Sequence, residues 1–432
     1  MLILSHAFNM DGRAASLTIT DKIPFLLARG VKPYVLSAIT GHKDTRFPHY
    51  QLLPWGPSGL ALDGRYYFGL VFGQRTYTCL LACFLMNLLL LPFKLLEWLL
   101  FGLSSQASWS LPAAFHGMKL IRKEGITTVY STGGGWSAHY AAWLIKKFAG
   151  VQVSWIAEIH DPMYFQKKTG RETRFVQKLE RQICQTADHV CWFTKAALLS
   201  AQQRQPSLGA KGFVIYPGSI PPRTAWNERA ADTYEKQLTI AHFGTLAADR
   251  SLCPILKALS IFFQKFPQAR TQIRIHVYGS GYDKNTVETV RQTGLADILV
   301  PHGRVEHDKE SGLSGREQIF QNINRSDVLL ALHGTNEMCP EYIPSKLYDY
   351  FWTNRPILGL TTRNLELDDM LKARHAYVCN TLDIGSIVQQ IDEVYWDWRN
   401  GALRQTVYQP VSPEAAVDVI LNRLSPKPLK TA

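Results

Sequence analysis

The stretch DVLLALHGTNEMCPEYIPSKLYDYFWTNRPILGL, residues 327–360, contains the unit from which this chain is built. An apolar run of strand length comes first, a short helix-like pattern begins near Ser345, and a second apolar run follows the turn TNRP. A strand, a helix and a second strand in that order predict a βαβ unit and hence a parallel sheet. Between the strands, EYIPSKLYD (341–349) begins and ends with a carboxylate, which fits either a ligand clamp or the ordinary start of a helix.

The same alternation continues on both sides of this stretch. Apolar runs of strand length occur at 2–5, 33–38, 50–55, 127–131, 151–159, 189–193, 212–216, 238–244, 273–281, 298–303 and 376–380. The proline-rich, polar segment 217–237 has no periodicity and is typical of a linker. We therefore expect an α/β protein with two Rossmann-like domains, 1–216 and 238–400, facing a cleft, and a C-terminal helical segment, 401–432, that packs back toward the first domain. Ligands bind at the carboxyl ends of the strands in such domains.

The amino-acid composition of the chain limits the classes of partner that it can bind. The 432 residues carry a net charge of +12 with a pI near 9.3, which is compatible with nucleic acid, an anionic membrane surface or a phosphorylated small molecule. The basic residues are dispersed rather than striped along one element, which disfavours nucleic acid. Seven cysteines without a C-x-x-C pair argue against a zinc ribbon or disulfide framework and favour a reducing compartment. The first residues, MLILSHAFNMDGR, lack the basic flank of a signal peptide and predict a buried strand.

One segment, 76–103, is far more apolar than the rest of the chain. Its part CLLACFLMNLLLLPFKLLEWLLFGL (79–103) is long enough to cross a bilayer, for which about 20 apolar residues suffice. A single crossing would divide one sheet across the membrane, so we do not expect the segment to span it. Pro92 is expected to break it in two, leaving 93–103 as an interfacial anchor that dips into one leaflet, aided by the positive net charge. The alternative is an apolar helix buried between domains or in a dimer interface.

Most familiar catalytic signatures are missing. The sequence has no Walker A loop, no G-x-S-x-G, no H-E-x-x-H, no intact G-x-G-x-x-G after the first strand and no D-x-D. We therefore expect chemistry without a metal or another cofactor. Glycine turns remain at strand ends, where backbone N–H groups favour a phosphate, although many such turns need glycine only for steric reasons. They are Gly244, the pair Gly279 and Gly281, and Gly133–Gly135 with Gly134 at its centre.

Two side chains near strand ends are candidate ligand contacts. Arg250 lies shortly after Gly244, where a guanidinium can reach a diphosphate, or it is a solvated arginine at the start of a helix. His160, in AEIHDP, follows an apolar strand and can hydrogen-bond a substrate hydroxyl or carbonyl group. Alternatively, His160 bonds Asp161 and shapes the loop. The spacing alone does not choose between these roles.

The carboxylates of the opening stretch fit a ligand with two diols. Ser345 is a plausible N-cap, which places Asp349 one turn into the helix and facing the cleft. Glu341 lies in the preceding loop, and Pro344 keeps Ile343 extended. Because a carboxylate can accept two O–H bonds from a vicinal diol, the pair suits a ribose and a hexose.

In these features the C-terminal half resembles the retaining, metal-independent glycosyltransferases of GT-B fold that carry an E-x7-E motif. EYIPSKLYDYFWTNRPIL matches that motif in register and is most similar to the branch with P-S-K-L-x-E-Y, which includes enzymes of bacterial lipopolysaccharide and capsule synthesis. The order of elements matches over nearly the whole chain, while specific motifs lie within about 240–360. Two departures are that Asp349 replaces the second glutamate and that Thr245 stands where many members have a second basic residue.

The resemblance implies a role for each candidate residue. Glu341 would contact the transferred sugar, Asp349 the ribose diol, and Arg250 the diphosphate, while His160 matches the cleft histidine of the family. Gly12 and Gly134 would form loops near the donor phosphate and the acceptor. The catalytic candidates are thus His160, Glu341 and Arg250. The donor-binding candidates are Gly244, Thr245, Arg250, Gly279, Gly281, Tyr342, Ile343, Pro344, Ser345, Lys346, Leu347 and Asp349.

The expected function is glycosyl transfer from a nucleotide-diphosphate sugar to a lipid-linked or membrane-associated saccharide, in bacterial surface polysaccharide synthesis. The apolar segment favours a peripheral position at the cytoplasmic face of the inner membrane. The alternatives are an epimerase or hydrolase of nucleotide sugars on the same fold, or a protein that only binds a nucleotide sugar.

Overall fold

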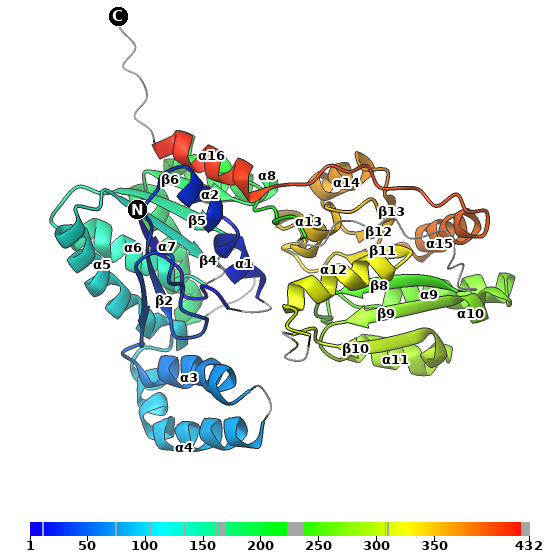
Figure 1. The fold of residues 1–432 in the computed structure, drawn as a ribbon, viewed down its shortest axis with the longest axis horizontal. Coiled ribbons are helices and arrows are strands. Elements are labelled where there is room, and N and C mark those ends of the chain that lie inside the picture. Colours follow the sequence, from blue (N-terminus) through cyan, green and yellow to red (C-terminus); the bar gives the residue numbers. More distant parts are fainter. Residues whose placement is uncertain are drawn as a thin grey trace, which may run out of the picture. The chain divides into compact units, whose positions relative to one another are not determined.

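The computed structural model describes residues 1–10, 13–73, 76–103, 105–133, 135–160, 163, 170–222, 237–306, 308 and 311–424 (Figure 1). The chain forms two compact units. The first comprises Met1–Pro217 together with Pro413–Ala432, and the second comprises Gly218–Ser412. The predicted pair of parallel-sheet α/β domains is confirmed.

The first unit is built on a seven-stranded sheet in the order β3-β2-β1-β4-β5-β6-β7, in which the described pairings are parallel. Its strands are β1 Leu2–Leu4, β2 Tyr34–Ala38, β3 His49–Leu52, β4 Thr128–Gly133, β5 Ser154–Ile159, β6 His189–Trp192 and β7 Gly212–Val214. Leu2 and Leu4 face one apolar layer and Ile3 faces the other, as the two-residue period of a strand requires. Both faces are therefore covered, which is typical of parallel sheets.

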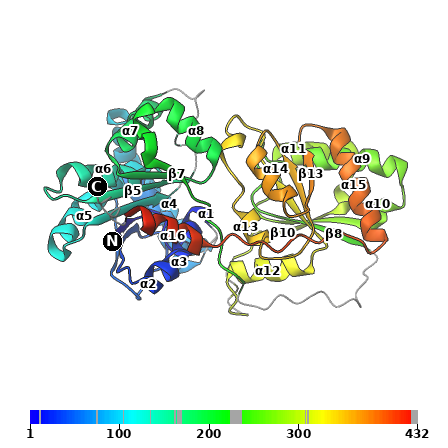
Figure 2. The same cartoon turned by 90° about the horizontal axis from the view of Figure 1, so that it is seen from above.

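Helices cover both faces of this sheet. They are α1 Ala14–Thr20, α2 Ile23–Ala28, α5 Ser110–Glu124, α6 Ser137–Phe148, α7 Arg171–Thr186, α8 Lys195–Arg204 and α16 Pro413–Leu424, with 3₁₀ turns at Ser105–Trp109 and Pro206–Lys211. Figure 2 shows α16 against the first unit. Its residues Ala416, Val417 and Ile420 pack into the same apolar layer as Ile3, and Arg29 of the segment after α2 pairs with Glu414.

The second unit is built on a six-stranded sheet in the order β10-β9-β8-β11-β12-β13, also with parallel pairings. Its strands are β8 Leu238–Phe243, β9 Ile273–Tyr278, β10 Leu299–Gly303, β11 Val328–Leu332, β12 Ile357–Thr361 and β13 Tyr377–Asn380. Its helices are α9 Cys253–Lys265, α10 Ala269–Gln272, α11 Lys284–Thr293, α12 Gly315–Arg325, α13 Lys346–Tyr350, α14 Leu365–Lys372 and α15 Ile384–Arg399, with 3₁₀ turns at Ala296–Ile298 and Cys339–Glu341.

The apolar segment forms one arm of a helical hairpin in the connection between β3 and β4. Helix α3, Pro57–Phe72, packs against α4, Tyr77–Leu100. Pro92 was expected to break this segment, and that prediction is wrong, because α4 continues through it as one helix. Proline removes one backbone hydrogen bond, and the 24-residue helix keeps the others.

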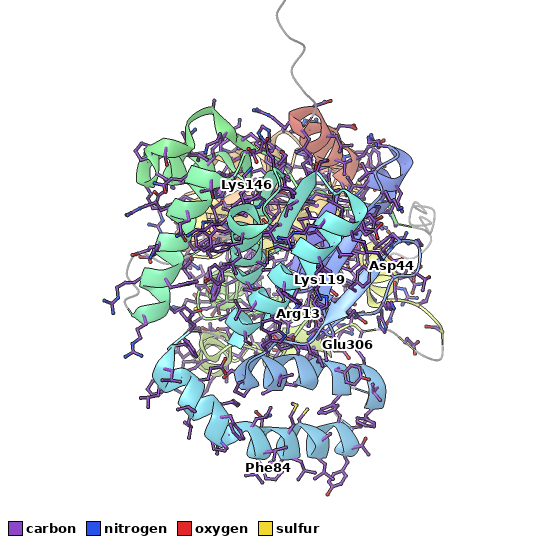
Figure 3. The ribbon with its side chains drawn as sticks, turned by 90° about the vertical axis from the view of Figure 1, so that its left-hand side faces the viewer. Arg13, Asp44, Phe84, Lys119, Lys146 and Glu306 are labelled. Atoms are coloured by element: carbon purple, nitrogen blue, oxygen red, sulfur yellow. The ribbon has the colours of Figure 1, made fainter. Side chains whose placement is uncertain are left out.

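Three polar side chains within the apolar part of α4 have partners in the hairpin. Asn87 donates to the Cys83 carbonyl and accepts from Lys94, while Glu97 accepts from the backbone N–H of Ser58 in α3. Among the described residues α4 is the helix long and apolar enough to cross a membrane by length and composition, yet only 6% of its most apolar window is buried. In Figure 3 Phe84 points away from the rest of the first unit.

The exposed face of α4 is therefore apolar almost throughout, and α4 is not buried within this chain. The exposed large side chains of α4 are Tyr77, Leu80, Leu81, Phe84, Leu85, Leu88, Leu89, Leu91, Phe93, Leu95, Leu96, Trp98, Leu99 and Leu100.

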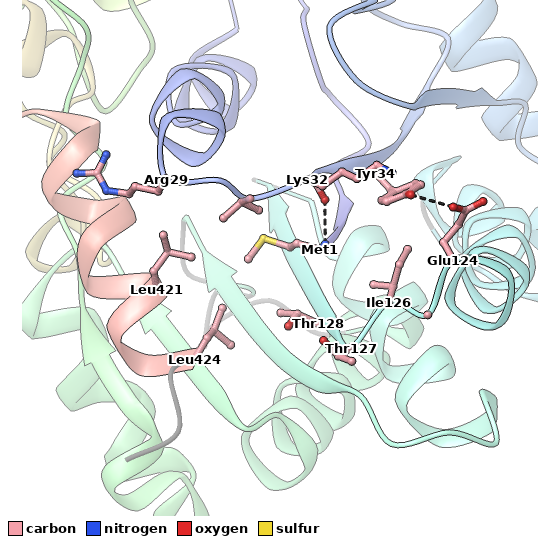
Figure 4. Close-up of a pocket in the computed structure, with 12 residues that line it drawn as sticks. Met1, Arg29, Lys32, Tyr34, Glu124, Ile126, Thr127, Thr128, Leu421 and Leu424 are labelled. Carbon is pink, nitrogen blue, oxygen red and sulfur yellow. Dashed lines mark hydrogen bonds between the residues drawn. The ribbon is translucent and has the colours of Figure 1, made fainter. Parts of the chain in front are cut away.

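A hollow of about 530 Å³ lies in the first unit at the amino ends of the strands (Figure 4). Met1, Lys32 and Thr128, which precede or begin β1, β2 and β4, line it together with Leu424 of α16. The hollow lies at the edge of the sheet opposite the carboxyl ends of the strands. The predicted site residue His160 lies at the carboxyl end of β5 and does not line the hollow.

Candidate functional site

Two glycine turns meet at the carboxyl ends of β8 and β9. Gly244 has a φ of +148°, a conformation that other residues rarely adopt, and its N–H donates to the Tyr278 carbonyl. A Cβ atom on Gly279 would lie 2.0 Å from the Gly244 carbonyl oxygen, so the two turns can pack only if residue 279 is glycine. Gly281, in contrast, has open space around it. The structure therefore brings Gly244 and Gly279 together, and Gly281 does not take part in this packing.

Arg250 is held over the turn that follows Gly244. Backbone hydrogen bonds in both directions between Ala247 and Arg250 close the loop, and the Arg250 Nε donates to the Thr245 carbonyl at 3.1 Å. The predicted donor contact Thr245 therefore offers its carbonyl to Arg250.

The charge of Arg250 acts on three side chains from different parts of the second unit. Burial lowers the pKa of His242 to about 4, a bond to the Leu330 carbonyl opposes this, and Arg250 lowers it further. Burial likewise lowers the pKa of His333, and the charge of Arg250 lowers it further. Burial raises the pKa of Tyr342 to about 12, and the charge of Arg250 opposes this rise. The guanidinium therefore lies where the ends of β8 and β11 meet the turn that carries Glu341.

That turn is anchored by two residues that the sequence analysis missed. The carbonyl of Tyr342 accepts from Nε2 of His333 at 3.2 Å and from the Asn364 amide at 2.8 Å. Nδ1 of His333 accepts from the Thr362 N–H, so Nε2 carries the proton. Asn364 also donates to the Cys339 carbonyl at 3.1 Å. The only sequence signal for His333 was its position as a polar residue directly after the apolar run of β11.

A second set of contacts joins the loop of Arg250 to the loop after β11. The Thr335 N–H donates to the Asp249 carbonyl at 2.8 Å, and the Asn336 amide donates to the Asp249 carboxylate. A Cβ atom on Gly334 would clash with the Tyr342 hydroxyl. These contacts bring Arg250 and the half-buried Glu341 to the same edge of the second sheet.

Asp349 is buried and already ion-paired. Its Oδ1 accepts from Nη2 of Arg316 at 3.1 Å, and its Oδ2 lies 3.4 Å from Nζ of Lys346. Sequence reasoning did not find Arg316, because it lies 33 residues away and looks like an ordinary surface arginine in the first turn of α12. Lys346, one of the predicted donor-binding residues, shares this cluster.

The start of α13 differs from the prediction in two details. Ser345 is at the N-cap position but makes no side-chain capping bond, because its backbone is itself helical. The Leu347 N–H donates to the Pro344 carbonyl, and the Leu347 side chain is buried. The backbone amide of Leu347 is therefore already hydrogen-bonded within this turn.

His160 lies at the carboxyl end of β5 in the first unit. Its Nε2 is 2.9 Å from the Thr132 hydroxyl and 3.0 Å from Glu158 Oε1, and its ring stacks on Phe193 at 4.7 Å. Asp161, its alternative partner in the sequence analysis, lies outside the described residues, as do Gly12 and Gly134. Within the described part of the chain, no three histidine, cysteine or acidic side chains form a metal-ligating group.

Comparisons with known proteins concern the fold. No protein-family model and no curated protein matches the sequence. The structure is similar to the lipopolysaccharide outer core galactosyltransferase WaaB in its apo form, with a TM-score of 0.56, 11% identity, and coverage of 98% of this chain and 99% of that chain. The structure is also similar to trehalose-6-phosphate synthase OtsA, with a TM-score of 0.56, 13% identity, and coverage of 98% of this chain and 95% of that chain.

A variant of S. aureus TarM in complex with Fondaparinux, alpha-GlcNAc-glycerol and UDP is also similar, with a TM-score of 0.51 and 10% identity over 72% of this chain. This chain spans 58% of the TarM chain, little more than half its length. The two parallel-sheet units thus match the GT-B fold of glycosyltransferases.

Proposed function

We propose that this protein is a glycosyltransferase that moves a sugar from a nucleotide-diphosphate donor to a hydroxyl of an acceptor. The observation that carries this proposal is the convergence of the Gly244 turn, Arg250 and the anchored Glu341 turn at the carboxyl edge of the second sheet. Glycine turns and a guanidinium suit a diphosphate, and a carboxylate beside them suits sugar hydroxyls.

In this proposal, departure of the nucleoside diphosphate is the step that the second unit assists. Negative charge grows on the phosphates as the glycosidic bond to the leaving group breaks, and Arg250 and Lys346 would stabilise it. Glu341 would hold the transferred sugar. We further propose a retaining, metal-independent reaction, in which the acceptor hydroxyl attacks from the side of the leaving group and gives its proton to the departing phosphate. The spacing of Glu341 and Asp349, which resembles the E-x7-E motif, supports this choice.

The acceptor is proposed to be a lipid-linked or membrane-associated saccharide of bacterial surface polysaccharide synthesis. The exposed apolar face of α4 supports a position at the membrane, and its two ends return to one sheet, which favours a helix lying in one leaflet over a spanning one. The net charge of +12 supports an anionic surface, such as the cytoplasmic face of the inner membrane.

Nucleotide binding tests the enzymatic proposal. Thermal unfolding is measured with UDP, GDP, ADP and CMP and with their sugars, for the wild type, Arg250→Ala and Glu341→Ala. The matched control is Arg291→Ala, an exposed arginine of α11 that pairs with Glu288. We expect at least one nucleotide to raise the midpoint of the wild type and of the control, and Arg250→Ala to lose most of this shift. A wild type that responds to no nucleotide would contradict the proposal.

A product assay separates transfer from the two alternative activities. An epimerase or hydrolase would convert the nucleotide sugar without an acceptor, and a protein that only binds would leave it unchanged. If the protein transfers the sugar, the nucleotide sugar should be consumed only when membrane lipid from a polysaccharide-producing bacterium is present. The sugar should then appear in the lipid fraction.

Vesicle flotation tests the membrane position. Phe84, Leu88 and Leu95 are replaced together by serine, and the matched control replaces Leu365 and Leu382, which are exposed leucines of the second unit. We expect the wild type and the control to float with vesicles that contain anionic lipid, and the α4 variant to remain in solution. Equal flotation of all three proteins would favour a different role for α4, such as a dimer interface.

A further inference from the structure

The carboxylate of Glu158 is completely buried and has four hydrogen-bond donors. Its Oε2 accepts from Nζ of Lys22 at 2.7 Å and from the Tyr130 hydroxyl at 2.5 Å. Its Oε1 accepts from the Thr132 hydroxyl at 2.7 Å and is 3.0 Å from Nε2 of His160. Each carboxylate oxygen accepts about two hydrogen bonds, so this group is saturated.

This arrangement determines which nitrogen of His160 carries hydrogen. A carboxylate only accepts, so the contact between Glu158 and His160 requires a proton on Nε2. The Thr132 hydroxyl gives its own hydrogen to Glu158, so its contact with His160 at 2.9 Å also requires a proton on Nε2. Both contacts, which share the single hydrogen on Nε2, thus select the Nε2–H form of the ring. In the neutral ring Nδ1 is then left with a lone pair, which accepts hydrogen bonds.

Lys22 keeps the carboxylate charged at this depth. Burial on its own would raise the pKa of Glu158, whereas the Lys22 ammonium and the bond from His160 lower it far below its usual range. The Lys22 side chain is itself completely buried, between α1 and α2. A buried ion pair is a poor source of stability, because desolvation of two charges offsets their attraction. The pair is nevertheless joined to His160, because Glu158 contacts both Lys22 and the imidazole ring, and packing alone does not require this arrangement.

We propose that the Lys22–Glu158 pair is a positioning device that fixes His160 in its Nε2–H form and leaves Nδ1 as a hydrogen-bond acceptor. This positioning role does not depend on the proposed glycosyl transfer. Lys22 and Glu158 are positioning residues, because each acts through His160. The stacked ring of Phe193 limits rotation of the imidazole about its remaining axis.

Nitrogen-15 NMR of the full chain with labelled histidine tests the positioning role. Resonances of His160 are assigned as those lost in His160→Gln, and the one-proton ring form is read from the couplings of its two nitrogens. We expect the Nε2–H form in the wild type. Tyr130→Phe removes one donor to Glu158 without touching a charge or His160, and should leave that form unchanged.

The charge-balanced variant Lys22→Met/Glu158→Leu should change the tautomer of His160 to a mixture, because residue 158 then offers no acceptor. This variant is expected to fold, since apolar residues of similar size commonly replace a buried ion pair without loss of stability. An Nδ1–H form in the wild type would overturn the proposal whether or not the variant folds. An unchanged Nε2–H form in the folded double variant would also overturn it.

Discussion

The guanidinium of Arg316 donates to the carboxylate of Asp349 across 3.1 Å, so the side chain assigned by resemblance to the ribose already has a cationic partner. Lys346 lies beside the other oxygen of the same carboxylate. A carboxylate with two cationic neighbours still has lone pairs for a diol, and the cations hold it in one orientation. The aspartate, which is one methylene shorter than the glutamate of the E-x7-E motif, is thus part of a cluster rather than a lone clamp.

Asp349→Asn separates the ribose contact from the diphosphate contact. We expect the binding of UDP or GDP, whichever the wild type prefers, to weaken about tenfold, the effect of losing one charge-assisted hydrogen bond. Pyrophosphate has no ribose, and the variant removes a negative charge, so pyrophosphate should bind at least as tightly as before. Calorimetric titration measures both ligands. An equal loss for the two ligands would show that Asp349 acts only by positioning Arg316 and Lys346.

Asn364→Ala should loosen the turn that carries Glu341. Asn364 donates to the carbonyls of Cys339 and Tyr342 and caps α14 by accepting from the Leu367 N–H. Loss of the cap and of these bonds should reduce the free energy of unfolding by about 1–3 kcal/mol. Urea titration measures this loss, and thermal shift measures the response to the nucleotide sugar.

The control for Asn364 is Asp283→Ala, which removes the cap of α11 in the same unit. Both variants should lose stability, but only Asn364→Ala should lose the response to the sugar part of the donor. If Asp283→Ala loses that response to the same degree, the effect of Asn364 is general destabilisation.

Acid should destabilise both units through buried neutral histidines. Burial lowers the pKa of His139 in the first unit to about 3 and that of His242 in the second to about 4. In the unfolded chain each histidine binds a proton near pH 6.5, so stability is intact above that pH and falls as the pH drops toward the folded-state values. At pH 5 the loss should be about 2 kcal/mol for each histidine.

Urea unfolding at pH 7.5 and pH 5, followed separately for each unit, measures this loss. His242→Asn should flatten the pH dependence of the second unit without changing that of the first. A variant with the full pH dependence of the wild type would exclude His242 as its source.

A mutant cycle on Lys22 and Glu158 tests whether the pair is coupled. Lys22→Met alone leaves a carboxylate buried without its counter-charge and should cost about 3–5 kcal/mol of unfolding free energy. Lys22→Met/Glu158→Leu should recover most of that loss. Chemical denaturation of the wild type, the two single variants and the double variant gives the coupling energy, and additive effects would show that the two charges act independently.

A feature could be predicted from the sequence when the residues that form it lie close together along the chain. The alternation of strands and helices was visible in the sequence because strands buried on both faces, such as Leu2–Leu4, are continuous apolar runs. Gly244 could be placed because it directly follows the last residue of β8. Lys22 and Glu158 are 136 residues apart, and nothing local to either one indicates the other.

The predictions at Pro92 and Ser345 applied rules based on one residue type, and the surrounding structure overrode those rules. Pro92 did not end α4, because the rest of that long helix keeps its hydrogen bonds and packs on α3. Ser345 had the residue type of an N-cap but not its extended backbone. For Pro92 the residue alone gave the wrong prediction, because the packing of the whole helix decided the outcome. Ser345 does lie at the N-cap position, but it makes no side-chain capping bond.

The inclusion of α16 in the first unit has a consequence for biosynthesis. Ala416, Val417 and Ile420 complete an apolar layer that otherwise consists of residues from the first half of the chain. A ribosome must therefore synthesise the entire second unit before the first one can close its core. During that time the layer around Ile3 is uncovered and α4 exposes its leucines, so the nascent chain passes through a state that is prone to aggregation.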